Sequence, residues 1–400
     1  MSIDIPSVFT KEWGLVLGVG MMSTSAAAYE IVPASISPIV IRELSISPTA
    51  SSFIISVMFG VAVLTSIPIG IGLDHTDIRI ATVIAALALV IAGVWGWQAA
   101  SVESYWSLIG SRVLGGLAYA TIWNAGANLV GSSFDIESRA TAIGVFTASA
   151  PGGFAIGQFM GPFVADYIGW SANFAVFGLL TVMGLVIFLW TSHGLQPAVD
   201  ISTPRVEDFK RVLTSRNVWY VCAMGFMAFS LYLFLNSWMP TYLDEDLGLS
   251  LAQGGSMVAL FAAVGVFSRA TGGYLSDRLF DTRRRPIVVV SFVVTTPVVA
   301  VMAVSRRVLL VLVLLIIAGF FIQLCIGLFF TYIRELVETN VATTAIAALT
   351  AANLFGAFIS PIIAGVLIEQ TGNFLAAFGY AGLVAVIGLG LAWHAPEPNP

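Results

Sequence analysis

The chain has 400 residues, of which 58% are hydrophobic and only 10% are charged, with a formal net charge of −5 and a mean hydropathy of +0.94. A soluble globular domain carries about 25% charged residues, so this chain lacks the polar side chains that would cover a water-facing surface. The charge balance leaves no basic surface for nucleic acid. Two cysteines and three histidines are scattered along the sequence, which argues against a zinc site, a disulfide framework and a cysteine–histidine nucleophile. We therefore expect neither a metal nor a cofactor.

Apolar segments long enough to cross a bilayer, which takes roughly 20 residues, follow one another along the whole chain. Residues 1–11 are short, polar and unlike a cleavable signal peptide, so the first apolar segment is expected to remain as a transmembrane helix. The segments lie near 13–35, 52–72, 80–100, 105–129, 141–165, 172–192, 218–240, 252–275, 287–304, 308–332, 342–367 and 374–393. We expect an all-α membrane protein with twelve transmembrane helices.

One long polar stretch interrupts this series at residues 193–217. It divides the chain into two parts with six expected helices each. We expect an N-terminal six-helix bundle over 1–192, a cytoplasmic linker over 193–217 and a C-terminal six-helix bundle over 218–400.

Lysine and arginine are distributed unequally over the connections between these helices. With the N-terminus in the cytoplasm, Arg42, Arg306 and Arg307 fall on the outer side and Arg112 and Arg269 fall inside spans. The inner side then holds the remaining twelve of the 17 basic residues. Because cytoplasmic connections are enriched in these residues, we expect a multi-pass protein of the cell membrane with both termini in the cytoplasm.

The two halves repeat each other with one ungapped offset of 203 positions, the difference between Asp74 and Asp277. The same offset joins Gly70 to Gly273, Leu44 to Leu247, Ser47 to Ser250, Thr141 to Thr344, Gly153 to Gly356, Asp166 to Glu369 and Gly169 to Gly372. Such repeats are typical of secondary transporters, in which two parallel six-helix halves hold the substrate between them near the middle of the bilayer.

The most specific motif lies between the second and third helices expected in the second half. It reads Gly-Gly-Tyr-Leu-Ser-Asp-Arg over Gly272–Arg278, and the basic run Arg283–Arg285 follows. This stretch resembles the loop motif of the major facilitator superfamily, and the resemblance covers nearly the whole chain. The first half keeps part of the motif, and His75 stands where the family has arginine.

The resemblance implies a gate at the inner membrane face. The motif glycine lets two helices pack closely. In the family, the motif aspartate faces the N-terminus of a helix in the other half, whose positive dipole end attracts it. The residues expected to form this gate are Gly70, Asp74, Arg79, Gly273, Asp277 and Arg278. The alternative is an ordinary polar loop.

Two weaker motifs support the same resemblance. Arg112-x-x-Gly115-Gly116 lies in the fourth expected helix, where the family often has an arginine followed by glycines. In the fifth, the sequence Gly157-x-x-x-Gly161-Pro162 resembles the core of the family's antiporter motif, but its flanking residues differ. The alternative for Gly157, Gly161 and Pro162 is a face of small residues that packs against another helix, with a proline kink.

Glu30 and Arg112 are charged residues inside predicted spans, where each costs about 2.5–3.5 kcal/mol on insertion scales. Both fall in the outer half of the membrane, on helices that are neighbours in the family. A buried carboxylate beside an arginine stays charged, and it takes up a proton when that partner leaves. We expect Glu30 and Arg112 to couple transport to protons; the alternatives are a structural ion pair or a Glu30 that reaches outer water.

Arg269 lies about 12 Å inside the membrane from Asp277, at a rise of roughly 1.5 Å per residue. The stretch Arg269–Arg278 resembles a helix of nitrate/nitrite and organic-anion porters, in which the arginine binds the anion. Because Ser66 stands where the nitrate branch has a second arginine, a monovalent organic anion is favoured over nitrate. The alternative is a gate residue that pairs with Asp277 or Glu335.

Other polar side chains lie near the middle of predicted spans. We expect Tyr119, Tyr232, Asn236, Gln323 and Asn353 to line the substrate site together with Arg269. The alternative for each is a hydrogen bond to a backbone carbonyl of a neighbouring helix.

Together these patterns predict a secondary active transporter that moves a small solute, with a small organic anion as the favoured class, by alternating access. We expect a proton or another ion to be co-transported, a monomeric transport unit, the lipid bilayer as surroundings and no enzyme activity. The alternatives are a drug/proton antiporter and a transport-inactive membrane sensor.

Overall fold

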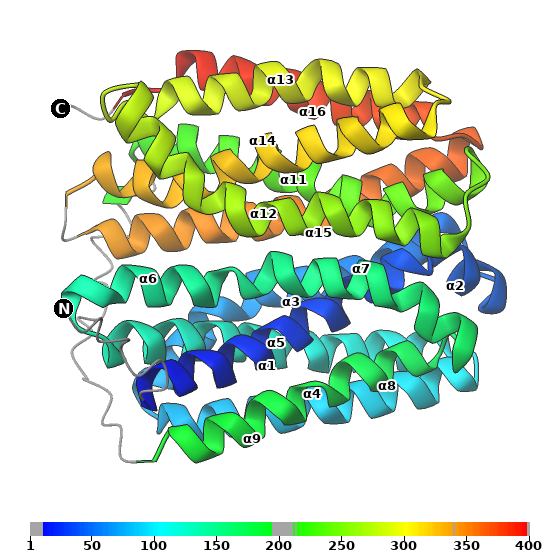
Figure 1. Cartoon of the computed structure of the whole chain (residues 1–400), viewed down its shortest axis with the longest axis horizontal. Helices are drawn as coiled ribbons and strands as arrows, with labels where there is room; N and C mark the ends of the chain where they lie inside the picture. Colours follow the sequence, from blue (N-terminus) through cyan, green and yellow to red (C-terminus); the bar gives the residue numbers. More distant parts are fainter. Residues whose placement is uncertain (1–10, 194–210, 213, 339–340, 398–400) are drawn as a thin grey trace, which may run out of the picture.

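The computed structural model describes residues 11–193, 211–212, 214–338 and 341–397. Apart from short connections, these residues form helices (Figure 1). In chain order the helices are α1 (Lys11–Ser35), α2 (Ser37–Glu43), α3 (Pro48–Asp74), α4 (Ile78–Ser101), α5 (Tyr105–Ser133), α6 (Ile136–Thr147), α7 (Ser149–Tyr167), α8 (Ala172–Leu179), α9 (Thr181–Thr191), α11 (Arg216–Glu245), α12 (Leu251–Leu279), α13 (Arg285–Val304), α14 (Val308–Glu335), α15 (Ala342–Thr371) and α16 (Leu375–His394).

The helices form two bundles. In Figure 1, α1 to α9 occupy the lower half of the view and α11 to α16 the upper half. One cluster of buried apolar side chains runs from Leu15 to Phe188, and a second lies chiefly on residues from Val212 to Ala395. The expectation of an all-α protein with two six-helix bundles is confirmed. The linker expected over 193–217 lies largely outside the described residues.

Ten of the expected spans are helical segments long and apolar enough, by length and composition, to cross a membrane. The other two are the single helix α5 and the pair α6–α7, which is interrupted at Ala148. Helix α5 carries Arg112, Asn124 and Asn128, which reduce its hydropathy. All the expected spans are therefore present as helices, with polar residues concentrated on the two less apolar ones.

Most contacts between the bundles come from three pairs of helices: α3 with α15, α7 with α12, and α1 with α11. We name the two ends of the molecule by their charged residues. Lys11, Arg79 and Arg284 lie at the basic end, where α1 begins and α16 ends (left in Figure 1), and Arg42 and Glu369 lie at the far end.

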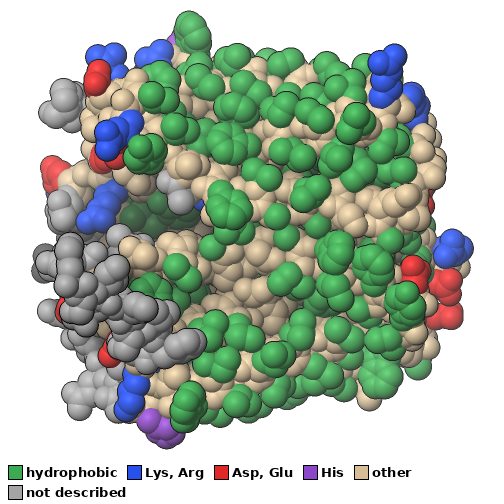
Figure 2. Space-filling view, viewed as in Figure 1, with side chains coloured by type: hydrophobic (Ala, Val, Ile, Leu, Met, Phe, Trp, Pro, Cys, Tyr) green, Lys and Arg blue, Asp and Glu red, His purple; other side chains and the backbone are tan. Residues whose placement is uncertain are grey.

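The bundles touch at the far end and separate toward the basic end. On α3, Ile54 and Met58 of the far-end half are fully buried, whereas Leu64 and Ile71 of the basic-end half are 78% and 56% exposed. Figure 2 shows a hollow between the bundles at the basic end. The described residues thus define a state in which the space between the bundles opens at the basic end.

Candidate functional site

Polar side chains from both bundles meet near the middle of the molecule. Glu30 of α1 and Tyr119 of α5 belong to one bundle, and Tyr232 of α11 and Arg269 of α12 belong to the other. Glu30 lies within electrostatic reach of both tyrosines, and so does Arg269. We call these four residues the central cluster. It contains one acid and one base, contributed by opposite bundles.

Arg112 is fully buried beside the central cluster, and backbone oxygens bind its guanidinium. Nη1 donates to the carbonyl oxygen of Tyr29 at 2.6 Å, Nη2 donates to that of Glu30 at 2.5 Å, and Nε donates to that of Ile54 at 3.0 Å. Pro33 explains the first bond, because proline has no N–H and leaves the carbonyl four residues earlier without its helical partner. Arg112 therefore joins α1, at the turn before Pro33, to α3.

Glu30 is only 2% exposed, yet its carboxylate does not form a direct ion pair with Arg112 among the ion pairs found in the described residues. Arg112 attracts the carboxylate over a longer distance while its N–H groups bind carbonyls. A buried carboxylate without a direct partner is costly, and a proton removes that cost. The Glu30 carboxylate is thus buried without a salt bridge among the described residues.

Arg269 has unused binding capacity. Its Nε has no hydrogen-bond acceptor among the described residues, and its guanidinium carbon lies 5.6 Å from the centroid of the Tyr232 ring. The two acids suggested as alternative partners, Asp277 and Glu335, bind Arg284 instead. The Arg269 guanidinium therefore has one N–H, that of Nε, without an acceptor among the described residues.

An aromatic stack crosses between the bundles at the central cluster. The Tyr232 ring stacks on Phe154 of α7, with 5.6 Å between centroids and 12° between planes. On another side it stacks on Phe261 of α12, at 5.7 Å and 27°. Because Phe154 and Tyr232 come from different bundles, this stack joins the two bundles at the central cluster.

The three amide side chains expected in the site differ in their contacts. Gln323 donates to the carbonyl oxygens of Phe261 and Ala262 on the neighbouring helix α12, and Asn236 donates to Tyr232 on its own helix. Neither polar atom of the Asn353 side chain has a partner among the described residues, although the residue is only 2% exposed. Buried polar groups are normally satisfied, so Asn353 is the amide best suited to a ligand or water.

Gln158 and Phe154 were not predicted as site residues. Gln158 Nε2 donates to the backbone oxygen of Asn236 at 2.6 Å, a fully buried bond between α7 and α11 of opposite bundles. Pro240 frees that oxygen, just as Pro33 frees the one bound by Arg112. The sequence contained a signal for this bond. A proline leaves the backbone oxygen four residues before it without a helical donor, so that oxygen can accept a hydrogen bond from another helix.

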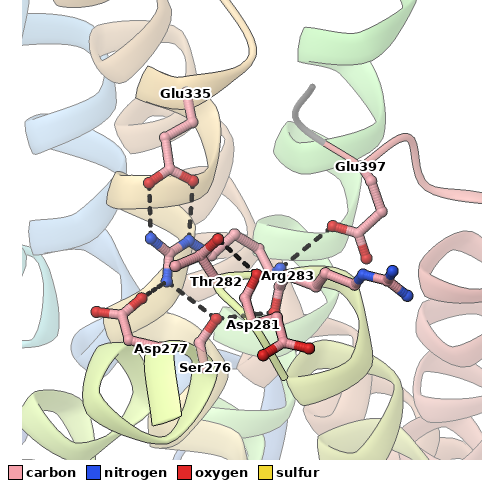
Figure 3. Close-up of polar contacts among 8 residues, drawn as sticks. Ser276, Asp277, Asp281, Thr282, Arg283, Glu335 and Glu397 are labelled. Atoms are coloured by element: carbon pink, nitrogen blue, oxygen red, sulfur yellow. Dashed lines mark hydrogen bonds and ion pairs between the residues drawn. The ribbon is translucent and has the colours of Figure 1, made fainter. Parts of the chain in front are cut away.

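A second polar network lies at the basic end and belongs to one bundle (Figure 3). Arg284 Nε and Nη2 donate to the two carboxylate oxygens of Glu335 at 2.8 and 2.7 Å, and Nη1 donates to Asp277 at 2.6 Å and to Ser276 at 2.9 Å. Glu397 accepts from the backbone N–H of Arg284 at 3.2 Å. The hydrogen bonds to Glu335, followed by those to Asp277, hold the pKa of Arg284 above its usual range. The network ties α12, α14 and the start of α13 together.

The expected gate is not closed in this state. Asp277 bonds within its own bundle instead of facing a helix N-terminus of the other bundle. A Cβ added at Gly70 or Gly273 would meet no heavy atom within 4 Å, so neither glycine supports a close helix contact here. The bundles are apart at this end, which removes the partners that the gate would need.

The remaining gate residues have separate surroundings. Arg278 is exposed, with its guanidinium 5.6 Å from the Tyr274 ring, and Arg79 follows the helix cap formed by Asp77. The side chain of Asp74 lies outside the described part of the structure.

The small residues of α7 lie against α1. A Cβ added at Gly157 would lie 2.8 Å from the carbonyl oxygen of Ala28, and one at Gly161 would meet Val32 at 2.8 Å and the Ser35 hydroxyl. Pro162 in turn lies against Gly255 of α12 in the other bundle. These contacts correspond to the packing interpretation of the motif.

Two repeated helical bundles with a polar site between them are the architecture of many secondary transporters. The chain belongs to the Major Facilitator Superfamily, whose sequence profile matches residues 16–353. Members of this superfamily are transporters and not enzymes, and this chain is accordingly a multi-pass transporter of the cell membrane.

Several curated relatives are anion transporters by name. The chain is 25% identical to a hexuronate transporter of Bacillus subtilis over 322 residues, which are 75% of each protein. It is 26% identical to a probable nitrate/nitrite transporter of Mycobacterium tuberculosis over 60% of each. It is 24% identical to a cis,cis-muconate transport protein of Acinetobacter baylyi, over 69% of this chain and 67% of that one.

The fold is also that of a solved transporter. A bacterial homologue of the human lysosomal transporter Spinster, in an inward-facing and unoccupied conformation, superposes with a TM-score of 0.80 at 17% identity. The match covers 96% of this chain and 97% of that one. The inward-facing and occupied form of that protein gives 0.77 over 95% and 96%.

Proposed function

We propose that this protein carries a small monovalent organic anion across the cell membrane together with a proton. Arg269 is the observation on which the proposal rests. It lies where the bundles meet, its Nε has no acceptor among the described residues, and Asp277 and Glu335, the acids expected as alternative partners, bind Arg284 instead. A guanidinium with free N–H groups in a poorly solvated site favours a carboxylate or oxyanion.

The central cluster offers one positively charged side chain to an anion, which argues for a singly charged substrate. Arg112 uses its guanidinium N–H groups on backbone oxygens, so Arg269 is the cation of the site that remains for an anion. Asn353 and the Tyr232 hydroxyl have no partners in the described structure and would bind the rest of the substrate. Tyr119 lies within electrostatic reach of Tyr232, while Gln323 bonds the neighbouring helix α12 and Asn236 bonds a carbonyl of its own helix.

Glu30 is our candidate for the proton carrier. With Glu30 ionised, the central cluster contains one negative and one positive side chain; with Glu30 protonated, only the arginine charge remains. Anion binding is therefore more favourable when Glu30 carries a proton. By the same coupling free energy, a bound anion favours protonation of Glu30. Arg112 acts by holding α1 and its Glu30 in place.

We infer that transport proceeds by rocking of the bundles over 1–192 and 218–400 around this cluster, in a monomeric unit. The basic end, with both termini, would face the cytoplasm. In the opposite state Asp74 and Asp277, with Gly70, Arg79, Gly273 and Arg278, would close that end.

A ligand screen tests the substrate class. The purified protein is heated with single monocarboxylates, with inorganic oxyanions and with lipophilic cations, because a ligand that binds the folded state raises the thermal midpoint. We expect a monocarboxylate to raise it at acidic pH more than at alkaline pH. Stabilisation by lipophilic cations and by no anion would favour drug/proton antiport instead.

A further inference from the structure

Glu369, near the end of α15, reaches across to the other bundle. Its Oε2 accepts a hydrogen bond from the backbone N–H of Thr49 at 3.3 Å. Ser47 is the N-cap of α3, and Thr49 lies in the first turn of that helix. A carboxylate of one bundle thus occupies the positive end of a helix of the other bundle, at the far end of the molecule.

The first turn of α3 has one backbone N–H without a partner in its own helix, and this contact supplies the acceptor. The first N–H groups of a helix have no partner inside it and carry partial positive charge. Pro48 has no N–H, and the N–H of Ala50 bonds the Ser47 side chain at 3.3 Å. The N–H of Thr49 is left over, and Glu369 accepts from it.

The repeat supplies an internal comparison. Ser250, which the offset pairs with Ser47, caps α12, but α12 completes its cap within itself by a capping box with Gln253. The position equivalent to Gln253 in α3 is Ala50, which has no side-chain acceptor. Asp166, which the offset pairs with Glu369, makes no hydrogen bond or ion pair with described residues. Only one of the two helices therefore depends on the opposite bundle for its cap.

Packing one turn earlier in α15 brings Glu369 into position. A Cβ added at Gly365 would lie 3.1 Å from the carbonyl oxygen of Pro48 and 2.8 Å from the Ser52 hydroxyl, so α15 and α3 approach closely there. The contact itself faces a pocket of about 450 Å³ at the far end, lined in part by Thr49, Tyr105 and Glu369. The carboxylate is therefore reached by dissolved ions.

We propose that Glu369 is a latch that holds the far ends together and favours the state open at the basic end. The bond joins opposite bundles, so it exists only while the far ends touch. A contact present in one of two states shifts their populations toward that state. The latch does not depend on which solute is carried.

Cysteine reactivity tests the latch. Ala34 of α1 is fully buried and packs in the apolar cluster of the opposite bundle, so Ala34→Cys reacts with a maleimide only when the far ends part. In a background without Cys222 and Cys325, its rate is proportional to the population open at the far end. We expect Glu369→Gln to raise this rate about two- to fivefold at low salt. Asp166→Asn, the pseudo-symmetric control, should leave it unchanged.

Two further measurements separate the latch from a general loss of stability. Cys325, buried in α14, should react at the same rate with and without Glu369→Gln when it is the single cysteine. High salt, which screens exposed charges, should raise the Ala34→Cys rate in the protein that keeps Glu369 and should leave the rate of the E369Q variant unchanged. An Ala34→Cys rate that E369Q leaves unaltered, or that D166N raises equally, would overturn the proposal.

Discussion

Arg112 binds the backbone oxygen of Glu30 and not its carboxylate. The bond is 2.5 Å long, and the same guanidinium holds the carbonyl of Tyr29 that Pro33 leaves free. The two residues expected to form a coupling pair therefore make no direct ion pair: the arginine binds carbonyls of α1 and α3, and the Glu30 carboxylate is left without a salt bridge among the described residues.

Replacing Arg112 by lysine should destabilise the protein. An ammonium group lacks the planar fork, so at least one of the three buried carbonyls loses its donor, at a cost of about 1–3 kcal/mol each. We expect a lower thermal midpoint for Arg112→Lys in detergent, whereas the exposed Arg42→Lys leaves it unchanged. An unaltered midpoint for Arg112→Lys would contradict the structural role.

Replacing Glu30 by glutamine should remove the proton dependence of transport. The amide resembles the protonated carboxyl at every pH, so uptake by Glu30→Gln should not respond to external pH, while exchange of substrate across the membrane continues. The measurement is the initial uptake rate across a pH series in proteoliposomes. Glu103→Gln, a change at an exposed glutamate, serves as control and should keep the wild-type profile.

Replacing Arg269 by lysine should weaken the binding of the anion. One point charge replaces two parallel donors, and the loss of a charge-assisted hydrogen bond corresponds to roughly a tenfold or larger rise in KM. Arg307→Lys, at an exposed arginine of the far end, should have no effect on KM. Equal KM values for Arg269→Lys and the wild type would remove the arginine from the substrate site.

Glycine substitutions on α7 test the packing against α1. Gly157→Ala places a Cβ 2.8 Å from a backbone oxygen, which forces the helices apart and should cost about 1–3 kcal/mol. Gly152→Ala on the same helix meets nothing within 4 Å and should be neutral. The two thermal midpoints, compared in one detergent, check this; equal values would argue against close packing at Gly157.

Hydropathy predicted the fold because lipid imposes the same requirement on every span. Each span needs an apolar run of sufficient length whose backbone N–H and C=O groups are hydrogen-bonded within the protein. Polar helices such as α5 were still recognised, since the charged Arg112 lies in an otherwise apolar segment. The fixed offset between Asp74 and Asp277 then predicted two similar halves. These features depend on local sequence and on the surrounding lipid, so they can be predicted from one amino-acid sequence.

The partners within the site could not be predicted in the same way. Glu30 and Arg269 were recognised because charges inside spans are rare, but the acceptor that a guanidinium selects depends on how helices approach in three dimensions. Arg112 binds carbonyls for this reason, and Asp277 binds Arg284 because the bundles are apart at the basic end. The latch at Glu369 likewise depends on a contact between residues 320 positions apart.

Uptake of a labelled monocarboxylate into proteoliposomes, with an acidic outside and a neutral inside, tests the central claim most directly. The account predicts accumulation above the outside concentration, which collapses when a protonophore removes the gradient, and a lower initial uptake rate in Arg269→Lys at low substrate concentration. Accumulation of a lipophilic cation in place of the anion, or carboxylate uptake that ignores both the gradient and Arg269→Lys, would contradict it.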